Sequence, residues 1–598
     1  MRRYAGANVV LLFDLVTIII KFNVKITLIH NLKLLKKKFK MRDSKQNKVL
    51  SSNEFSTNFY KSDKIFNDYI NKHLKGKSIK RIETNLEKIG KKAAGTLSEL
   101  SLEADHNPPE LVKRDKWGED IDKINFHPSY WEMMQIAIDS EMFAIKWDQK
   151  NDEFKTERNK MSFAISYFFA MSESGLYCPL CMTDAAATLI AKHCEEEDKH
   201  WLLKGIASKE LKDLKTGAMF LTEKAGGSDV GANLVTATHI DDKYYNLKGE
   251  KWFCSNVNAE IIFALARTDS EKKGTRGLSI FLIEPKKRDG SKNPLNIIRL
   301  KDKLGVKSMA SAECLLDKTE GKLIGEEFNG FKIMTDMINI SRLYNSVAAL
   351  SASRRALVEA YQYLKNRKTF GKTAISHALV RQKLQELGTL HVANFYLTWK
   401  TIETLDAAEN GDDKAKQLLR ILTPMVKKWS AEKGVYITRE SMELMGGIGY
   451  IEDQIMPKLM RDIMVLPIWE GAGNIMILDM LRASIKSKGI DIMFREIEEV
   501  AISKPNTFLK EQLKKIKVRF KELLTLEQDE REVKANFLFE DLTTLYQMTL
   551  ICSGTDNNNK KWMKPTLSFL EVKLKVKKKE NEKLLSVEEI DNLIGWDI

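Results

Sequence analysis

The sequence predicts a mainly α-helical protein that carries an all-β domain between two helical regions. Three observations predict this class. From residue 128 to 215, apolar residues recur at the spacing of an amphipathic helix. Over residues 217–330, glycine-rich turns separate short β-type runs, and from Phe331 the helical spacing returns. Helix, then strand, then helix is an uncommon order, so it narrows the fold more than the composition does.

The composition is that of an ordinary globular protein. Its 598 residues allow about three or four domains, and 43% hydrophobic with 30% charged residues exclude wholesale disorder. Six cysteines are too few for a disulfide framework and suit a reducing compartment. Lys and Arg (97) exceed Asp and Glu (82) by 15. This excess permits a nucleic-acid or anionic-membrane partner, although a solvated lysine-rich surface is the simpler explanation.

The N-terminal part of the chain is expected to lie outside the folded core. The apolar run 8–20 contains Asp14 and is shorter than the roughly 20 residues that span a bilayer, so no stable membrane anchor is predicted. The basic segment 36–40 is compatible with a mitochondrial presequence, and Met41 with a later start. The compartment, mitochondrial or cytoplasmic, therefore stays open. Residues 41–100 are polar with little periodicity and predict a loosely held arm.

The elements that follow are assigned from their spacing. Apolar residues share helical faces in four segments: 133–140, 161–174, 357–364 and 435–445. Strands are predicted at 251–256, 261–266, 278–283 and 313–316. The predicted domains are an N-terminal extension or arm (1–100), an N-terminal helical domain (101–216), a middle β domain (217–330), a C-terminal helical-bundle domain (331–485) and a helical C-terminal extension (486–598).

No metal site and no common nucleotide motif is predicted. Cys178 and Cys181 have zinc-knuckle spacing, but no second cysteine pair follows at finger distance. His193 and Cys194 suit the surface and core of a helix. The glycines of segment 446–449 end a helix, whereas a dinucleotide fingerprint opens one.

Two motifs in the β region offer groups to a flat ligand. The loop LTEKAGGSD (221–229) combines paired glycines, which let the backbone approach a ligand, with the hydroxyls of Thr222 and Ser228. On the strand KWFCSN, Phe253 and Ser255 lie two residues apart and therefore on one face of the sheet. A cofactor could stack on the ring and hydrogen-bond the hydroxyl. Taken alone, a plain turn and a half-buried strand explain these residues as well.

Two further motifs lie in the helical region. Arg367, in RKTFG, closes an amphipathic helix, where it can bind a phosphate or offset the helix dipole. Glu470, in PIWEGAGN, stands between apolar residues and a glycine turn. Burial would raise the pKa of its carboxyl, as in a general base, whereas an exposed helix-cap glutamate explains the pattern without any function.

Together and in this order, the motifs resemble those of the acyl-CoA dehydrogenase family: T-E-x-x-x-G-S-D, K-W-F-x-S-N, R-x-x-F-G, and L-x-G-G-x-G-Y followed by I-W-E-G. The resemblance covers roughly residues 100–485. It implies an N-terminal helical domain, a middle β-barrel or sandwich and a C-terminal four-helix bundle, with the remainder as a helical tail. It further implies FAD as cofactor, an acyl-CoA substrate, a homodimer or homotetramer, and an electron acceptor such as an electron-transfer flavoprotein.

The resemblance also implies residue roles by position. Glu470 corresponds to the catalytic base, which takes the Cα proton while a hydride passes from Cβ to FAD, giving a trans-2-enoyl-CoA. Ser228 and Arg342 correspond to substrate-binding residues. The implied cofactor-binding residues are Leu221, Thr222, Gly227, Ser228, Phe253, Cys254, Ser255, Arg367, Phe370, Gly446, Gly447, Gly449, Gly471 and Asn474. Of these, Arg367 and Phe370 correspond to residues that reach the FAD of a neighbouring subunit.

One branch of the family fits best. The segments NPPEL (107–111), FHP (126–128) and IWEG (468–471) are similar to the AidB-like, alkylation-response branch. Ala472 stands where many members have Thr or Ser, and Asn474 replaces a common Gln, so one hydroxyl contact to FAD is missing. An acyl-CoA dehydrogenase is therefore weighed against a second hypothesis, an AidB-like flavoprotein with weak turnover that mainly binds DNA or sequesters acyl-CoA.

Overall fold

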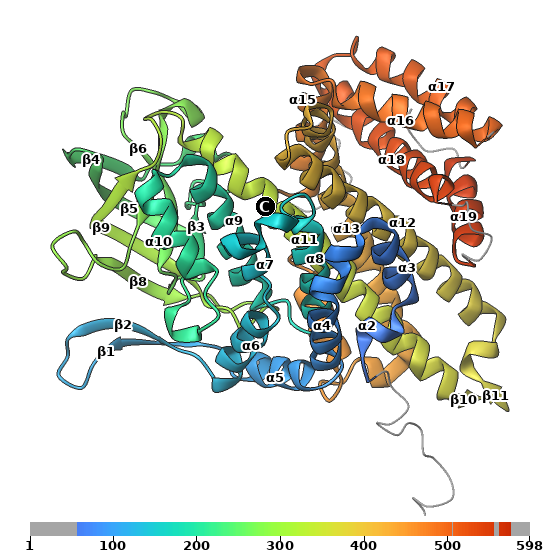
Figure 1. The fold of residues 1–598 in the computed structure, drawn as a ribbon, viewed down its shortest axis with the longest axis horizontal. Helices are drawn as coiled ribbons and strands as arrows, with labels where there is room; N and C mark the ends of the chain where they lie inside the picture. The colour runs from blue at the N-terminus through green and yellow to red at the C-terminus, as the bar shows by residue number, and fades with distance from the viewer. Residues whose placement is uncertain (1–56, 505, 555–560, 576–598) are drawn as a thin grey trace, which may run out of the picture.

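The computed structural model describes residues 57–504, 506–554 and 561–575. A β domain lies at one side of the molecule, a helical bundle at its centre, and a group of C-terminal helices at the other side (Figure 1). The predicted fold class, mainly helical with an inserted β domain, is confirmed. In these ranges no helix combines the length and apolarity needed to cross a membrane. The apolar run 8–20 lies outside the described residues.

The N-terminal region is built of helices and one hairpin. The helices are α2 (Phe59–Ser62), α3 (Lys64–His73), α4 (Gly76–Ala93), α5 (Thr96–His106), α6 (Pro128–Asp139), α7 (Ala144–Trp147), α8 (Arg158–Ala170), α9 (Tyr177–His193) and α10 (Glu196–Ile206). The hairpin consists of β1 (Glu110–Arg114) and β2 (Asp120–Asn125), and it extends beneath the β domain (Figure 1).

The loosely held arm expected over residues 41–100 is wrong for the part that the structure describes, from residue 57 onward. Ile82 and Leu86 lie on one face of α4 and are fully buried. Phe66 of α3 stacks on Tyr167 of α8 with ring centres 5.3 Å apart. The apolar stripe of α4 is narrow and lysines and glutamates cover its other faces, so the high average polarity concealed an amphipathic helix.

The middle domain is a closed sheet. Its strands are β3 (Gly217–Phe220), β4 (Thr236–Asp241), β5 (Tyr244–Ser255), β6 (Ile261–Arg267), β7 (Leu278–Ile283), β8 (Leu295–Leu300) and β9 (Ser311–Leu323). The pairings β4–β5, β5–β9, β9–β7, β7–β6 and β6–β4 return to their starting strand, so the sheet closes on itself. The continuous apolar runs of β6 and β7 are buried, as expected for strands covered on both faces.

The C-terminal half is a helical bundle followed by further helices. The bundle contains α11 (Gly330–Asn366), α12 (Ala378–Glu409), α13 (Asp413–Met445), α14 (Ile455–Ile463) and α15 (Gly473–Lys486), with the short strands β10 (Lys368–Thr369) and β11 (Lys372–Thr373) between α11 and α12. The extension contains α16 (Gly489–Ser503), α17 (Thr507–Leu523), α18 (Gln528–Ser553) and α19 (Met563–Lys575). A helical tail was predicted and is observed.

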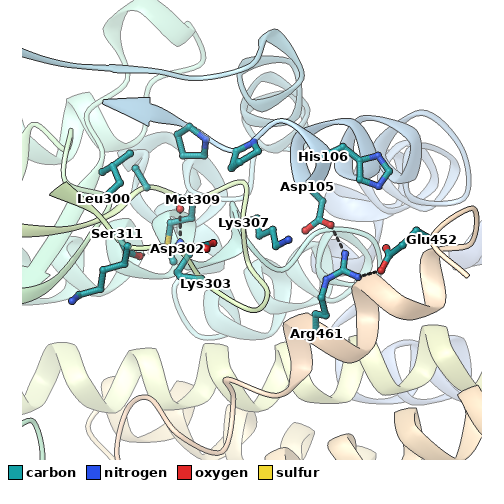
Figure 2. Close-up of a pocket in the computed structure, with 14 residues that line it drawn as sticks. Asp105, His106, Leu300, Asp302, Lys303, Lys307, Met309, Ser311, Glu452 and Arg461 are labelled. Atoms are coloured by element: carbon teal, nitrogen blue, oxygen red, sulfur yellow. Dashed lines mark hydrogen bonds and ion pairs between the residues drawn. The ribbon is translucent and has the colours of Figure 1, made fainter. Parts of the chain in front are cut away.

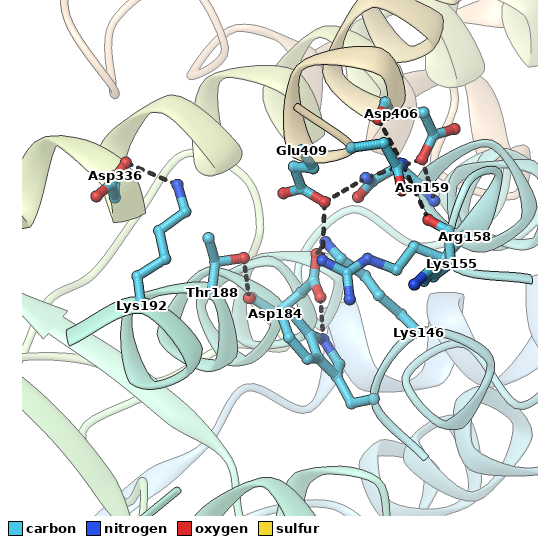
Figure 3. A network of polar contacts seen from close by, with 12 residues as sticks. Lys146, Lys155, Arg158, Asn159, Asp184, Thr188, Lys192, Asp336, Asp406 and Glu409 are labelled. Carbon is cyan, nitrogen blue, oxygen red and sulfur yellow. Dashed lines mark hydrogen bonds and ion pairs between the residues drawn. The ribbon is translucent and has the colours of Figure 1, made fainter. Parts of the chain in front are cut away.

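Buried polar groups join the N-terminal helices to the bundle (Figure 3). Within the N-terminal helices themselves, Lys146 of α7 and Asp184 of α9 form an ion pair of 2.8 Å that is closed to solvent. At the start of α8, Asp406 of α12 accepts hydrogen bonds from the main-chain N–H groups of Asn159 (2.9 Å) and Lys160 (3.0 Å). A carboxylate at this place satisfies amides that a helix N-terminus leaves without intrahelical partners.

A second junction joins all three domains. Glu173, just before α9, accepts hydrogen bonds from Ser101 Oγ at 2.5 Å and Ser308 Oγ at 2.6 Å. It also accepts one from the main-chain N–H of Leu176 at 2.7 Å, and it forms an ion pair with Lys458 of α14 at 3.1 Å. The N-terminal domain, the β8–β9 loop and α14 therefore meet at one carboxylate.

The β8–β9 loop also approaches the main chain of α14. Asp462 Oδ1 accepts a hydrogen bond of 2.6 Å from the N–H of Val306. A Cβ atom at Gly305 would lie 2.4 Å from the carbonyl carbon and oxygen of Arg461. Only glycine permits this approach, so the spacing between the β domain and α14 is set by main-chain atoms.

Candidate active site

Glu470 lies in a constrained turn between α14 and α15. Its φ is +59°, which is unusual for a residue other than glycine, and Gly471 follows with φ +100°. A Cβ at Gly471 would come within 2.5 Å of Met476 Cε. Backbone strain of this kind persists only where the surrounding structure enforces it, and it is concentrated at functional sites.

Burial raises the pKa of the Glu470 carboxyl, while a hydrogen bond from Ser341 and the charges of Arg342 and Lys427 act in the opposite direction. Both cations contact main-chain oxygens. Arg342 Nε donates to the carbonyl of Glu470 at 3.1 Å, and Arg342 Nη1 pairs with Asp479 at 2.7 Å. The predicted substrate residue Arg342 is therefore placed beside the catalytic candidate, partly committed to holding its turn.

The N-terminal turn of α9 lies close to Glu470. Burial raises the pKa of the Cys178 thiol to about 12, and the nearby charge of Glu470 adds to this shift. Lys303, from the β8–β9 loop, is also a neighbour of Cys178. Burial lowers the pKa of its ammonium to about 8, and the neighbouring Cys178 and Asp462 act against that shift. Glu470, α9 and the β8–β9 loop are therefore neighbours.

The β5 strand presents an aromatic face toward the same loop. Phe253 is 52% exposed, and Lys301 Nζ lies 4.5 Å from its ring centre and 3.6 Å from that of Trp252. Ser255 Oγ is 3.0 Å from Ser311 Oγ. Cys254 faces the domain core, so only its main chain is open to a ligand.

A cavity of about 710 Å³ borders this face (Figure 2). Figure 2 shows Lys303, Met309 and Ser311 on one side and Asp105, Glu452 and Arg461 on the other. Its lining includes the cations Lys301, Lys303, Lys307 and Arg461 and the acids Asp105, Asp302 and Glu452, and Arg461 is paired with Asp105 and Glu452. The lysines on the β-domain side favour an anionic or electron-rich ligand. Sequence reasoning missed Lys301, Lys303 and Ser311, because nothing in a loop of ordinary composition marks which side chains turn toward a cavity.

The predicted loop 221–229 is held by a buried carboxylate. Glu223 forms an ion pair with the fully buried Lys251 at 2.7 Å and accepts a hydrogen bond from the N–H of Leu234 at 2.5 Å. This anchor leaves Thr222 and Ser228 with free hydroxyls near Gly227, whose added Cβ would stand 3.3 Å from the Thr222 side chain. Glu223 therefore anchors the base of the loop, and the hydroxyls of Thr222 and Ser228 stay available to a ligand.

Other predicted cofactor residues are not brought to this face within one chain. Phe370 is 97% exposed at the tip of β10–β11, at the end of the bundle away from the β domain (Figure 1), with Arg367 at the base of the same hairpin. Gly446 and Gly447 are exposed beyond α13, Gly449 is buried against it, and Asn474 is exposed on α15. Their assignment to a cofactor stays a prediction.

The residues around β5 suit a flavin. An exposed ring, a hydroxyl two residues later and a cavity with several cations can stack a flat ring system and hydrogen-bond its polar edge. Glu470, a half-buried glutamate whose pKa is raised, and Lys303, which lines the cavity, both neighbour Cys178. The fold and the site together define a flavin-dependent oxidoreductase of the acyl-CoA dehydrogenase type.

Comparison with known proteins shows that the chain belongs to the acyl-CoA dehydrogenase family. Residues 329–485 match the acyl-CoA dehydrogenase C-terminal domain, 218–319 its middle domain, and 50–210 the adaptive response protein AidB N-terminal domain. The predicted AidB-like branch, the oxidoreductase class and FAD as the family cofactor are thereby confirmed.

Similar proteins agree on this membership. Acyl-CoA dehydrogenase family member 11 of Caenorhabditis elegans is 32% identical over 77% of this chain and 76% of its own length. The putative acyl-CoA dehydrogenase AidB of Escherichia coli is 31% identical over 67% and 74%. A solved structure of Caenorhabditis elegans ACDH-11 in complex with C11-CoA has a TM-score of 0.80 at 27% identity, covering 88% of this chain and 93% of that one.

Proposed function

We propose that this protein catalyses the FAD-dependent α,β-dehydrogenation of an acyl-CoA thioester to the trans-2-enoyl-CoA, with Glu470 as the base. The observation that carries the proposal is the state of Glu470. Glu470 is half-buried, and burial raises the pKa of its carboxyl. No ion pair to this carboxyl occurs among the described residues, so it is free to accept a proton.

The chain's residues divide the reaction as follows. Glu470 takes the Cα proton onto a carboxylate oxygen as the Cα–Cβ double bond forms. Bound FAD would supply the oxidising capacity by accepting the hydride that leaves Cβ. The charges of Arg342 and Lys427, close behind the turn, act against the rise in the pKa of Glu470 that burial causes. A base is most effective when its pKa lies near the working pH.

The substrate class is supported by one of the similar proteins. The solved structure of ACDH-11 holds C11-CoA, so acyl-CoA thioesters of about that chain length are the first ligands to test here. The cations lining the cavity suit the phosphate-bearing groups of such ligands.

The deciding experiment is an anaerobic titration of the purified flavoprotein with a panel of acyl-CoA chain lengths, followed by flavin absorbance.

Glu470→Gln should keep the flavin spectrum and lose about 10²- to 10⁴-fold in the rate of reduction, because the proton acceptor is gone. Glu443→Gln, an exposed glutamate on α13, is the matched control and should behave as wild type. Normal reduction by Glu470→Gln would refute the role. Tight binding of acyl-CoA without reduction of the wild type would favour sequestration.

We also propose that the active unit is a homo-oligomer. Arg367 and Phe370 lie at an exposed hairpin away from the β5 face of their own chain, where they are available to the site of a second copy (Figure 1). Light scattering after gel filtration should give a dimer or tetramer. Phe370→Ser should weaken flavin retention, and a monomer that retains flavin fully would contradict the proposal.

A further inference from the structure

Two cations, Lys427 and Arg342, hold the turn that carries Glu470 by donating to its main-chain carbonyls. Lys427, in the middle of α13, is fully buried. Its Nζ donates to the carbonyl of Pro467 at 3.2 Å and to the carbonyl of Gly471. Arg342 donates to the carbonyl of Glu470 itself at 3.1 Å. Three carbonyls of the segment 467–471 are thus fixed by side chains from two bundle helices.

A lysine in this place is physically unusual. Burial lowers the pKa of Lys427 to about 8, which shows how poorly the site solvates its charge. No carboxylate in the described ranges forms an ion pair with it. A buried cation without a direct counter-ion is unfavourable for stability, and such local conflicts are expected at functional sites.

We infer that Lys427 is the positioning residue for Glu470: it fixes both flanks of the strained turn and supplies a positive charge behind the carboxyl. The inference rests on the proposed function of Glu470 as base. Lys427 itself contacts neither substrate nor flavin in this scheme; it acts through the turn. Arg342 also holds this segment, but it forms an ion pair with Asp479 as well. The side-chain contacts of Lys427 given above go to this segment alone.

The electrostatic part has a definite sign. Around Glu470 stand Ser341 and Arg342 of α11, Lys427 of α13, and Cys178 and Cys181 of α9. Lys427 has Arg342, Lys428 and Glu432 as further charged neighbours. The thiols stay neutral because burial raises the pKa of both. Removing the Lys427 cation leaves only the Ser341 hydrogen bond and the charge of Arg342 to oppose burial, so the pKa of Glu470 rises further.

Two substitutions separate the two roles. Lys427→Gln keeps an N–H donor and removes the charge, whereas Lys427→Met keeps the approximate volume and removes both. Lys416→Met is the matched control, since Lys416 is exposed on the same helix and pairs with Asp413 within it. Hydrogen–deuterium exchange of the whole holoprotein provides a readout that needs no turnover.

In Lys427→Met, amides of 468–476 should exchange about tenfold faster or more, while β-domain peptides keep their wild-type rates. In Lys427→Gln, the exchange rates of these amides should lie between those of wild type and of Lys427→Met. Unchanged exchange at the turn in Lys427→Met would overturn the inference. A uniform acceleration across the molecule would do so as well, because it would show a merely structural lysine.

Kinetics then test the charge. The acid limb of the pH profile for flavin reduction should move up by roughly one pH unit in both Lys427 variants, with less than threefold change in acyl-CoA affinity. An unmoved limb in both variants would remove the electrostatic role. If no acyl-CoA reduces the wild-type flavin, the proposed function fails, and the exchange data still decide whether Lys427 holds the turn.

Discussion

Glu173 is fully buried and Glu470 is half-buried, and the pKa values of the two glutamates are shifted in opposite directions. Burial raises the pKa of both, but at Glu173 the charge of Lys458 and hydrogen bonds from Ser101, Ser308 and Leu176 outweigh it, so that the net pKa is lowered. At Glu470 the pKa stays raised, because its two cations donate to main-chain oxygens. Burial therefore does not decide the chemistry of a carboxyl; the atoms that the nearby donors contact decide it.

The difference separates a structural carboxylate from a reactive one. The carboxylate oxygens of Glu173 are contacted directly by Lys458, Ser101, Ser308 and Leu176, and these contacts join three domains. The cations beside Glu470 hold its backbone, and its carboxyl accepts a hydrogen bond from Ser341 without forming an ion pair among the described residues. Asp406 is an intermediate case, since it accepts amide hydrogen bonds without a direct ion pair, and burial raises its pKa to about 7.

The largest expected effect comes from breaking the Glu173 side of the comparison. Lys458→Met should lower the free energy of unfolding by about 3–5 kcal/mol, because Glu173 and Asp462 would both lose their buried cation. The midpoint of urea unfolding measures this. Adding Glu173→Gln to Lys458→Met should restore part of the loss; no recovery would mean that the pair is not the cause.

The next effect is a pH dependence at Asp406. The folded protein binds this proton more tightly than the unfolded chain, so wild-type stability falls as pH rises from about 4 to about 7. Asp406→Asn removes the titration. The difference in unfolding free energy between wild type and variant should therefore change by roughly 1 kcal/mol per pH unit in this window, in favour of wild type at the acid end. If this difference did not depend on pH in the window, Asp406 would be an ionised structural carboxylate like Glu173.

A smaller effect is expected next to Glu470. Ala472 is the N-cap of α15 and offers no side-chain hydrogen bond. Ala472→Ser should stabilise the protein by about 1 kcal/mol, because a hydroxyl can accept from a free amide of the first turn. A higher thermal midpoint with an unchanged pH profile of flavin reduction would separate helix capping from the control of Glu470.

The smallest effect is the stability change in Glu470→Gln. Because the folded-state pKa of this glutamate is raised, its contribution to stability is lost as pH rises through that pKa. The variant should therefore unfold at a slightly higher denaturant concentration than wild type at pH 8 and not at pH 4. Destabilisation at pH 8 would show that Glu470 makes ionic contacts like those of Glu173.

The sequence predicts the fold class and the strands β5, β6, β7 and β9 because these depend on local patterns, whereas β1, β2, β3, β4 and β8 were not predicted. The runs that became β6 and β7 are apolar and bounded by turns, and the helical stripes recur at the expected spacing. The helices before α5 were missed because a stripe as narrow as that of α4 is diluted by its charged faces. Lys427 and Lys428 are indistinguishable in sequence, and only tertiary packing buries one of them fully beneath the Glu470 turn.

Gly305 has a consequence for how this protein can change its substrate preference over evolutionary time. Main-chain atoms of the β8–β9 loop and of α14 touch there, and a side chain at position 305 has no room. The distance between the β domain and the helix that precedes Glu470 is therefore fixed by this contact. Under the proposed function, longer or bulkier acyl chains would be accommodated by exchanging residues along the cavity walls, because the two halves cannot be spread apart without breaking the contact.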